Sequence, residues 1–171
     1  MFRNLICLLV IAAVAGCSSP PPVASPPSSS APDPAAVQAW VDQVCAADDP
    51  ILVVSAVVAM SPKFAQGQQP TEADRPAVIA TLTKLRDMHT ESKTAYDAIG
   101  PSPLPRGDEL VAGRRKGLGE IVTKLQDYLD KARSFPPQGL DSPLLLAGID
   151  AMTWKPEGPS LSDLQAPKCT K

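Results

Sequence analysis

The sequence lacks most of the residues and motifs that mark a catalytic or metal-binding site. Among its 171 residues there is one histidine, His89, and the four cysteines form no C-x-x-C pair. No G-x-S-x-G motif and no H-x-x-x-H pair is present. Serine hydrolysis, thiol exchange and zinc binding need those groups at those spacings. We therefore expect a protein that is not an enzyme, with no catalytic residue, no metal and no cofactor.

The sequence also lacks an excess of basic charge. Its formal net charge is −2, and its lysines and arginines form no stripe. Nucleic-acid recognition needs a basic patch and electrostatic docking to anionic lipid needs a basic cluster, so we expect neither. Aromatic residues make up only 4% of the chain and are scattered. The core must therefore consist mainly of Leu, Val, Ile and Ala, which suits helices.

The first 17 residues have the pattern of an export signal. Arg3 precedes an apolar run over residues 5–14, and small residues stand directly before Cys17. The run is shorter than the ~20 residues that a membrane-spanning helix needs, which indicates a signal peptide, residues 1–16. Its end resembles the lipobox of bacterial lipoproteins. That resemblance implies that Cys17 carries diacylglycerol and anchors the protein on the extracytoplasmic face of the cell membrane, the alternative being a signal cleaved without lipidation.

Residues 17–34 form a low-complexity segment behind the signal. Apart from Cys17, this segment consists almost wholly of proline, serine and alanine. Such a composition cannot form a core, so we expect a disordered tether. Residues 35–171 are numerous enough to bury a core of their own and are expected to form one domain.

Two cysteines remain when the signal is removed and the anchor is lipidated. Cys7 leaves with the signal, so Cys45 and Cys169 are left in an oxidising compartment with only one possible pairing. We therefore predict a disulfide between them, which would tie the first helix to the C-terminal tail.

Hydrophobic periodicity predicts an all-α fold. Apolar residues recur at the spacing of one helix face over residues 37–45, 78–99 and 110–132. We expect an up-down bundle of three to four long helices, followed by a short C-terminal turn near 160–163. The expected helices lie near 34–48, 51–60, 71–99, 108–134 and 142–155.

The segment 51–60 is ambiguous. Its β-branched residues are typical of a buried strand, but the chain offers no second strand to pair with it. We therefore expect a helix that is buried on nearly all sides. Pro50 stands either in the first turn of this helix or at a kink in one long helix, and both alternatives remain open.

Local patterns give expectations for single residues in the later helices. Asp108 is a good N-cap for the helix that follows it. Leu145, Ile149 and Met152 are expected on the buried face of the last helix. His89 lies at the edge of an apolar face, where a structural role is more common than a catalytic one.

Three glycines stand out in the third long helix, at positions 113, 117 and 119. Glycine inside a helix costs ~1 kcal/mol relative to alanine. Either the helix frays or starts later here, or Gly113 and Gly117 let another backbone approach closely. In the second case they form a seam where a partner helix or an apolar ligand enters, together with Val54. Arg114 is expected on the apolar side of this helix.

Short segments at residues 40–45, 100–110 and 166–169 accompany the lipobox and the tether. Together they resemble a class of small secreted or lipid-anchored helical proteins of actinobacteria, mycobacteria included. The class is largely uncharacterised. The resemblance therefore implies the fold, the disulfide and the envelope location, and it carries over no site residue.

These observations support two hypotheses about function. The first is a lipid-anchored cell-envelope protein that is a non-enzymatic interaction or structural module, with an envelope protein as its partner. The alternative is a carrier or binder of an apolar envelope molecule, which would lie between helices near Gly113, Gly117 and Val54.

Overall fold

The computed structural model describes residues 31–59 and 69–169 of the chain. The signal peptide, Cys17 and the tether up to residue 30 lie outside the described residues, so the predictions for them stay predictions. The described helices all belong to one compact unit, Pro32–Lys171.

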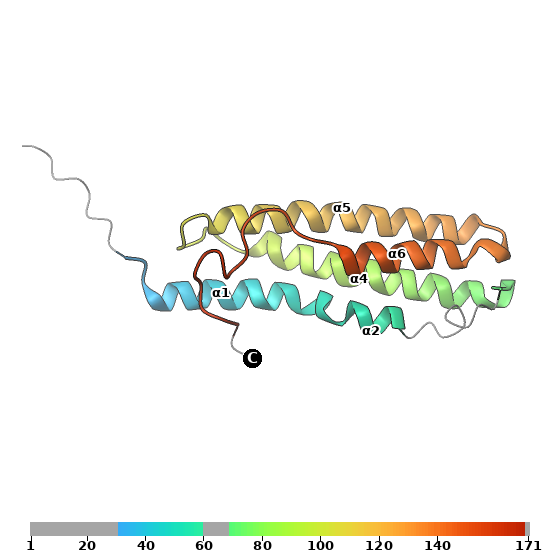
Figure 1. Cartoon of the computed structure of the whole chain (residues 1–171), viewed down its shortest axis with the longest axis horizontal. Coiled ribbons are helices and arrows are strands. Elements are labelled where there is room, and N and C mark those ends of the chain that lie inside the picture. Colours follow the sequence, from blue (N-terminus) through green and yellow to red (C-terminus); the bar gives the residue numbers. More distant parts are fainter. Residues whose placement is uncertain (1–30, 60–68, 170–171) are drawn as a thin grey trace, which may run out of the picture. The chain divides into compact units, whose positions relative to one another are not determined.

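The described residues form an all-α fold without strands, as the sequence predicts. Figure 1 shows α1 and α2 in line along one side, with α4, α5 and α6 running alongside them. The chain reverses between α4 and α5, so the predicted up-down bundle is confirmed. The α-helices and the 3-10 helices (η) are α1 (Pro34–Asp48), η1 (Asp49–Val53), α2 (Val54–Ala59), η2 (Glu72–Asp74), α4 (Arg75–Ala98), α5 (Gly107–Ser134), η3 (Pro137–Gly139) and α6 (Asp141–Thr153).

The core lies mainly between α4 and α5, which α1 and α6 cover. Leu82 and Leu85 of α4 and Leu118, Leu125 and Leu129 of α5 are completely buried. Each buried leucine contributes roughly 1.5–3 kcal/mol relative to an exposed one. These residues keep the helical spacing over several turns, which is why periodicity alone predicted the core of both helices.

A capping box begins η2, which leads directly into α4, and an arginine fixes the start of α4 itself. The backbone N–H of Thr71 donates to the Asp74 carboxylate at 2.8 Å, which satisfies a group that the helix leaves unpaired. Arg75 donates to the backbone carbonyl oxygens of Ala132 and Phe135 at 2.6 and 2.9 Å. The start of α4 is thereby attached to the end of α5.

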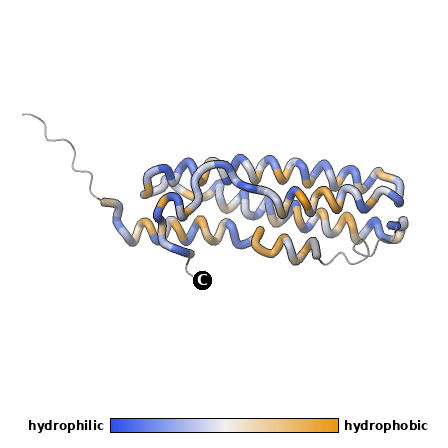
Figure 2. Tube along the Cα trace, in the orientation of Figure 1, coloured by the Kyte–Doolittle hydropathy of each residue, from blue (hydrophilic) through white to orange (hydrophobic). Residues whose placement is uncertain are grey.

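The expectation that residues 51–60 are buried on nearly all sides is wrong. Leu52 and Val53 are 58% and 53% exposed, whereas Val54 is buried. Pro50 has no backbone N–H for an α-helical hydrogen bond, and the chain forms η1 here, with α1 ending before it and α2 beginning after it. Because only one side of η1 faces the bundle, its other apolar side chains lie at the surface. Figure 2 shows this hydrophobic stretch where η1 meets α2.

The face of α6 that was expected to be buried is the exposed one. Leu145, Ile149 and Met152 all lie at the surface. Three consecutive leucines at 144–146 place an apolar residue on every side of the helix, so residue type alone could not identify the inner side. The inner side instead contains small residues, which let α6 pack closely against the bundle. The buried residues are Pro143, Leu144, Ala147 and Gly148.

The expected capping role of Asp108 is also wrong. α5 begins one residue earlier, and Arg106 before it has a left-handed φ of 63°. The Asp108 carboxylate accepts a hydrogen bond from the backbone N–H of Ser102 at 2.8 Å, so it holds the connector between α4 and α5. A side chain at Gly107 would clash with Ser102 and press on Trp40, so the helix must begin with glycine.

Candidate functional site

A non-helical C-terminal segment, residues 154–169, crosses the bundle and is called the strap. Figure 1 shows it passing from the end of α6 across α5 to α1. Its far end is held by the predicted disulfide between Cys45 of α1 and Cys169, whose Cα atoms lie 5.8 Å apart. Within it, the backbone N–H and the hydroxyl of Ser160 donate to the Asp163 carboxylate. These bonds form the short C-terminal turn that the sequence predicts.

The strap lies directly on the two glycines that were expected to form a seam. A Cβ atom at Gly113 would clash with the backbone carbonyl of Glu157. One at Gly117 would lie 2.9 Å from the indole nitrogen of Trp154. α5 is continuous through both positions, so the fraying alternative is wrong. The close approach of a backbone is found at Gly113, whereas at Gly117 the approaching group is a side chain. Both approaching groups belong to the strap of the chain itself, however, and not to a partner helix.

Val54, the third residue of the expected seam, lies elsewhere. It is buried at the start of α2, where α2 packs against α4 and α6. A hollow of about 170 Å³ lies beside the strap, and Glu120, Lys124, Asp150 and Trp154 contribute to its lining. Small-molecule sites usually have volumes of roughly 300–1,000 Å³ and mainly apolar walls. The seam residues are therefore divided between two places, and the hollow beside Trp154 is small and lined in part by charged residues.

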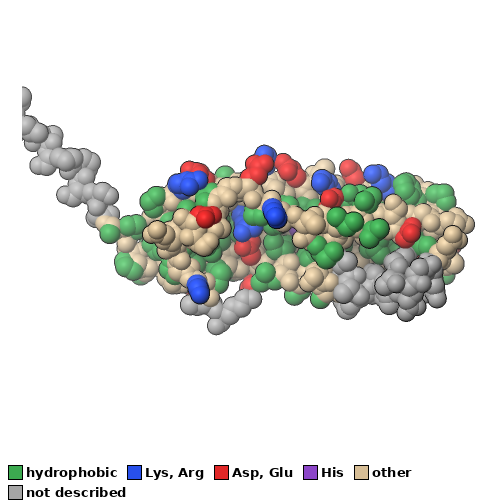
Figure 3. All heavy atoms as spheres, viewed as in Figure 1, with side chains coloured by type: hydrophobic (Ala, Val, Ile, Leu, Met, Phe, Trp, Pro, Cys, Tyr) green, Lys and Arg blue, Asp and Glu red, His purple; other side chains and the backbone are tan. Residues whose placement is uncertain are grey.

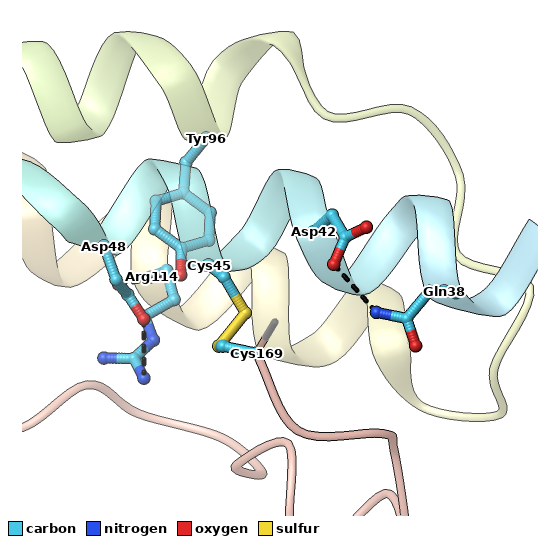
Figure 4. Close-up of a disulfide and its surroundings, with 7 residues drawn as sticks. All are labelled: Gln38, Asp42, Cys45, Asp48, Tyr96, Arg114 and Cys169. Carbon is cyan, nitrogen blue, oxygen red and sulfur yellow. Dashed lines mark hydrogen bonds and ion pairs between the residues drawn. A yellow bond between two sulfur atoms is a disulfide. The ribbon is translucent and has the colours of Figure 1, made fainter. Parts of the chain in front are cut away.

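Beneath the strap, polar side chains from three helices meet in a polar cluster, defined as Asp48 of α1, Tyr96 of α4 and Arg114 of α5. The Tyr96 hydroxyl donates to the Asp48 carboxylate at 2.9 Å, and the Arg114 guanidinium lies 3.7 Å from that carboxylate. Figure 4 shows the cluster beside the disulfide. Arg114 also lies 5.6 Å from the centre of the Trp154 ring, within cation–π range. The cluster therefore links three helices and the strap.

Burial controls protonation within the polar cluster. It raises the pKa of Asp48, although the Arg114 charge and the Tyr96 hydrogen bond oppose the rise. Burial and the neighbouring carboxylate also raise the pKa of Tyr96, so its hydroxyl stays protonated and continues to donate. Because the Asp48 carboxylate is engaged by both partners, the arrangement suits holding helices together better than exchanging protons with a substrate.

His89, expected at the edge of the apolar face of its helix, is buried in the core. It is 1% exposed, and its Nδ1 lies 2.8 Å from the carbonyl oxygen of Leu85. Burial lowers the pKa of His89, so the ring is neutral near pH 7 and Nδ1 carries the proton donated to that carbonyl. One turn away, the Ser92 hydroxyl donates to the carbonyl of Ala47 in α1 at 2.6 Å. Both polar side chains therefore serve the packing of α4.

Metal-binding side chains do not converge in the described part of the chain. There, no group of three or more His, Cys, Asp or Glu residues is placed so that it could hold an ion. Within residues 31–59 and 69–169, no helix combines the length and the hydropathy that a membrane crossing requires.

Sequence reasoning missed the polar cluster and the role of Arg115. Arg115 donates to the carbonyl oxygens of Tyr96 and Ile99 at 3.0 Å each, at the C-terminus of α4. The last carbonyls of a helix need donors, so a basic residue nearby is a general signal. Which residue supplies them depends on the packing of two helices, which no local pattern contains.

The outer side of α6 is a second candidate site. Four large apolar side chains are exposed on it, Leu145 by 65% and Met152 by 54%. No charged residue stands between Asp141 and Asp150. Figure 3 shows hydrophobic side chains gathered over α6. Apolar side chains in water are unfavourable, so such a surface tends to bind a partner. We call these four residues the apolar face of α6: Leu145, Leu146, Ile149 and Met152.

No protein-family model, no curated protein and no solved structure matches this chain. The strap over α5 and the apolar face of α6 are therefore the features from which a function can be inferred.

Proposed function

We propose that this protein is a lipid-anchored cell-envelope protein whose helical bundle serves as a non-enzymatic interaction module. The observation that carries this proposal is the apolar face of α6. The helix buries Ala147 and Gly148 while it leaves four larger apolar side chains in water. Contiguous exposed apolar patches on soluble domains commonly mark binding surfaces. The apolar face of α6 is therefore where an envelope partner would bind.

The envelope location draws support from two sources. Cys17 follows a signal-like segment with the pattern of a lipobox, and other short segments resemble small lipid-anchored helical proteins of actinobacteria. The disulfide between Cys45 and Cys169 also favours a compartment outside the cytoplasm, because disulfides persist where the environment is oxidising.

The polar residues of the bundle support a structural use. Tyr96 and Arg114 both engage Asp48, and His89 is buried against the carbonyl of Leu85. A general acid or base must reach a bound substrate, and these groups are occupied within the fold. A turnover that a single substitution in the polar cluster abolished would contradict the non-enzymatic proposal.

The carrier alternative draws less support from the seam for which it was proposed. The strap fills the space over Gly113 and Gly117, and the hollow beside Trp154 is lined by charged residues. An apolar ligand at this place would first have to displace the strap. We therefore keep the interaction module as the proposal.

The anchor is tested by the fate of Cys17 in an actinobacterial host. We expect the mature full-length protein in the membrane fraction, with its N-terminal peptide heavier by a diacylglycerol group. Cys17→Ala should abolish the added mass and the membrane recovery of the mature form. Cys7→Ala, which lies within the signal, should leave both unchanged. A mature protein with an unmodified Cys17 would contradict the anchor.

The interaction face is tested by photo-cross-linking in the same cells. A photoreactive side chain in place of Leu145 should form adducts with an envelope component. The same side chain in place of Thr90, which is exposed on α4, serves as the matched control and should form none. Equal yields at both positions, or no adduct at either, would contradict an interaction role for α6.

A further inference from the structure

We propose that the partner of the apolar face of α6 is the lipid surface of the membrane, so that the bundle rests with α6 against the bilayer. This inference rests on the proposed function, because it names what binds the face on which that function depends. Aliphatic side chains inserted at the boundary between headgroups and acyl chains would hold the helix there, without charge attraction.

The chemistry of the face matches lipid. All of its side chains are aliphatic or thioether groups, and none forms hydrogen bonds. Asp150, the nearest acidic residue in α6, accepts a hydrogen bond from the Tyr128 hydroxyl of α5 at 2.7 Å. Its carboxylate is therefore held toward α5. Interfaces between proteins usually have a polar rim and about one hydrogen bond per 100–200 Å² of buried area. The side chains of the apolar face of α6 have no donor or acceptor groups for such hydrogen bonds.

A second pair of apolar side chains is exposed in η1. Leu52 and Val53 of η1 are both exposed, and α2, which follows directly, packs against α6. Figure 3 shows hydrophobic side chains over α6 and over the start of α2 on the same side of the bundle. Hydrophobic side chains over α6 and over the start of α2 thus face the same side, which suits a partner as extended as a bilayer.

The surface is small for pairing with a second copy of this chain. The apolar face of α6 and the pair in η1 amount to six side chains. A specific protein interface has about 20–30 residues of all kinds on each side, so these six would form only its apolar part. Insertion into lipid needs no complementary surface of that size, and the anchor would supply the remaining affinity.

The chain between the anchor and the bundle is long enough for this contact. Residues 17–33 can span at most roughly 55 Å when fully extended. α5, with 28 residues, is about 42 Å long. An anchored chain can therefore reach the membrane with any side of the bundle. Attachment also raises the effective concentration of α6 at the lipid surface, so a weak insertion suffices.

The test attaches the protein to vesicles without using Cys17. The chain from Ser18 onward contains the whole compact helical unit, and an N-terminal hexahistidine binds it to phosphatidylcholine vesicles that contain a nickel-chelating lipid. Cys45 and Cys169 are joined, so Leu145→Cys introduces a single reactive thiol for an environment-sensitive fluorophore. Thr90→Cys on α4 is the matched control.

On vesicles, the label at position 145 should shift to shorter emission wavelength and be quenched by nitroxide-bearing lipid. It should also be protected severalfold from aqueous iodide, while the label at position 90 stays accessible. Ile149→Ser combined with Met152→Ser should restore iodide access at position 145. Both residues are exposed, so the helical content should not change, and circular dichroism checks this.

Equal iodide access at positions 145 and 90 would overturn the lipid assignment. Protection that appears without vesicles and increases with protein concentration would also overturn it, in favour of a second copy. Photo-adducts at position 145 that contain protein and no lipid would also overturn the lipid assignment. They would still agree with the proposal that the bundle is an interaction module. None of these outcomes depends on lipidation of Cys17. That modification is measured separately, from the mass of the N-terminal peptide.

Discussion

Gly113 shows how a residue that is unfavourable in its own helix can be required by what packs on it. Glycine inside a helix costs ~1 kcal/mol relative to alanine, and α5 is a helix of 28 residues with Gly113 in its interior. The strap offsets this cost, because the Glu157 carbonyl occupies the place of a side chain at position 113. One turn away, Lys116 donates to the Glu157 carboxylate at 2.8 Å. At this point the strap, and not helix propensity, determines the residue.

Gly113→Ala should destabilise the protein by about 1–3 kcal/mol, because the strap must move to admit a methyl group. Gly119→Ala is the matched control, since the nearest atom to a Cβ there is Lys93 Cε at 3.8 Å. That substitution should stabilise the protein by up to about 1 kcal/mol, through helix propensity alone. Urea unfolding measures both effects. Changes of the same sign would show that the strap does not press on Gly113.

At the scale of elements, the sequence predicted helices wherever one apolar face persists over several turns. Leu82 and Leu85 in α4 and Leu118 and Leu125 in α5 belong to such faces, and their burial followed from spacing alone. In α6 the pattern failed, because consecutive leucines occupy every side and the small residues Ala147 and Gly148 determine which side packs. The two adjacent small residues mark the side of α6 that packs inward. A search for large apolar residues alone does not detect this signal.

The candidate site was less predictable than the fold, because its residues meet only through tertiary packing. Asp48 and Tyr96 are 48 positions apart, and Arg114 joins them from a third helix. The placement of Arg114 on the apolar side of α5 was predicted from periodicity, and its side chain is indeed only 19% exposed. Its partner was not predictable, since no local pattern relates α5 to the end of α1.

Arg114→Met tests whether the polar cluster joins these helices. Without the guanidinium, the pKa of Asp48 should rise further, because the cation that opposes the effect of burial is lost. At pH 7 the partly buried carboxylate stays ionised without its counter-charge, and we expect a loss of about 1–3 kcal/mol in the free energy of unfolding. Because the pKa of Asp48 is higher in the folded state than in the unfolded state, ionisation of Asp48 destabilises the fold as the pH rises through that pKa. The loss of stability in Arg114→Met should therefore become smaller as the pH falls and Asp48 is protonated.

Urea unfolding of the wild type and the variant at pH 7 and pH 4 measures this dependence. His89 titrates in both proteins, so its contribution cancels in the difference. Arg133→Met, which removes an exposed ion pair with Asp130, is the control and should cause little change at either pH. An Arg114→Met effect that is equal at both pH values would show that the guanidinium does not act through Asp48.

At the scale of the whole helical unit, one covalent bond closes almost the entire described chain into a loop. Cys45 and Cys169 are 124 positions apart, so the loop contains the end of α1, every later helix and the strap. Closing a long loop restricts the unfolded chain more than closing a short one. The strap therefore stabilises the bundle in two ways, through its contacts with α5 and through the constraint at its end.

Cys45→Ala combined with Cys169→Ala should lower the free energy of unfolding by about 3–5 kcal/mol, as the chain-entropy account gives for a loop of this length. Reductant added to the wild type should reproduce that loss and should not affect the double variant. Amide exchange around Gly113 should accelerate, because the strap then depends on the Lys116–Glu157 pair and on the contact between Arg114 and Trp154. Protection of a label on α6 by vesicles should persist, since the apolar face of α6 lies outside the strap. If that protection were lost together with the disulfide, the strap and the apolar face would form one coupled site, and the separation of stability from binding would be wrong.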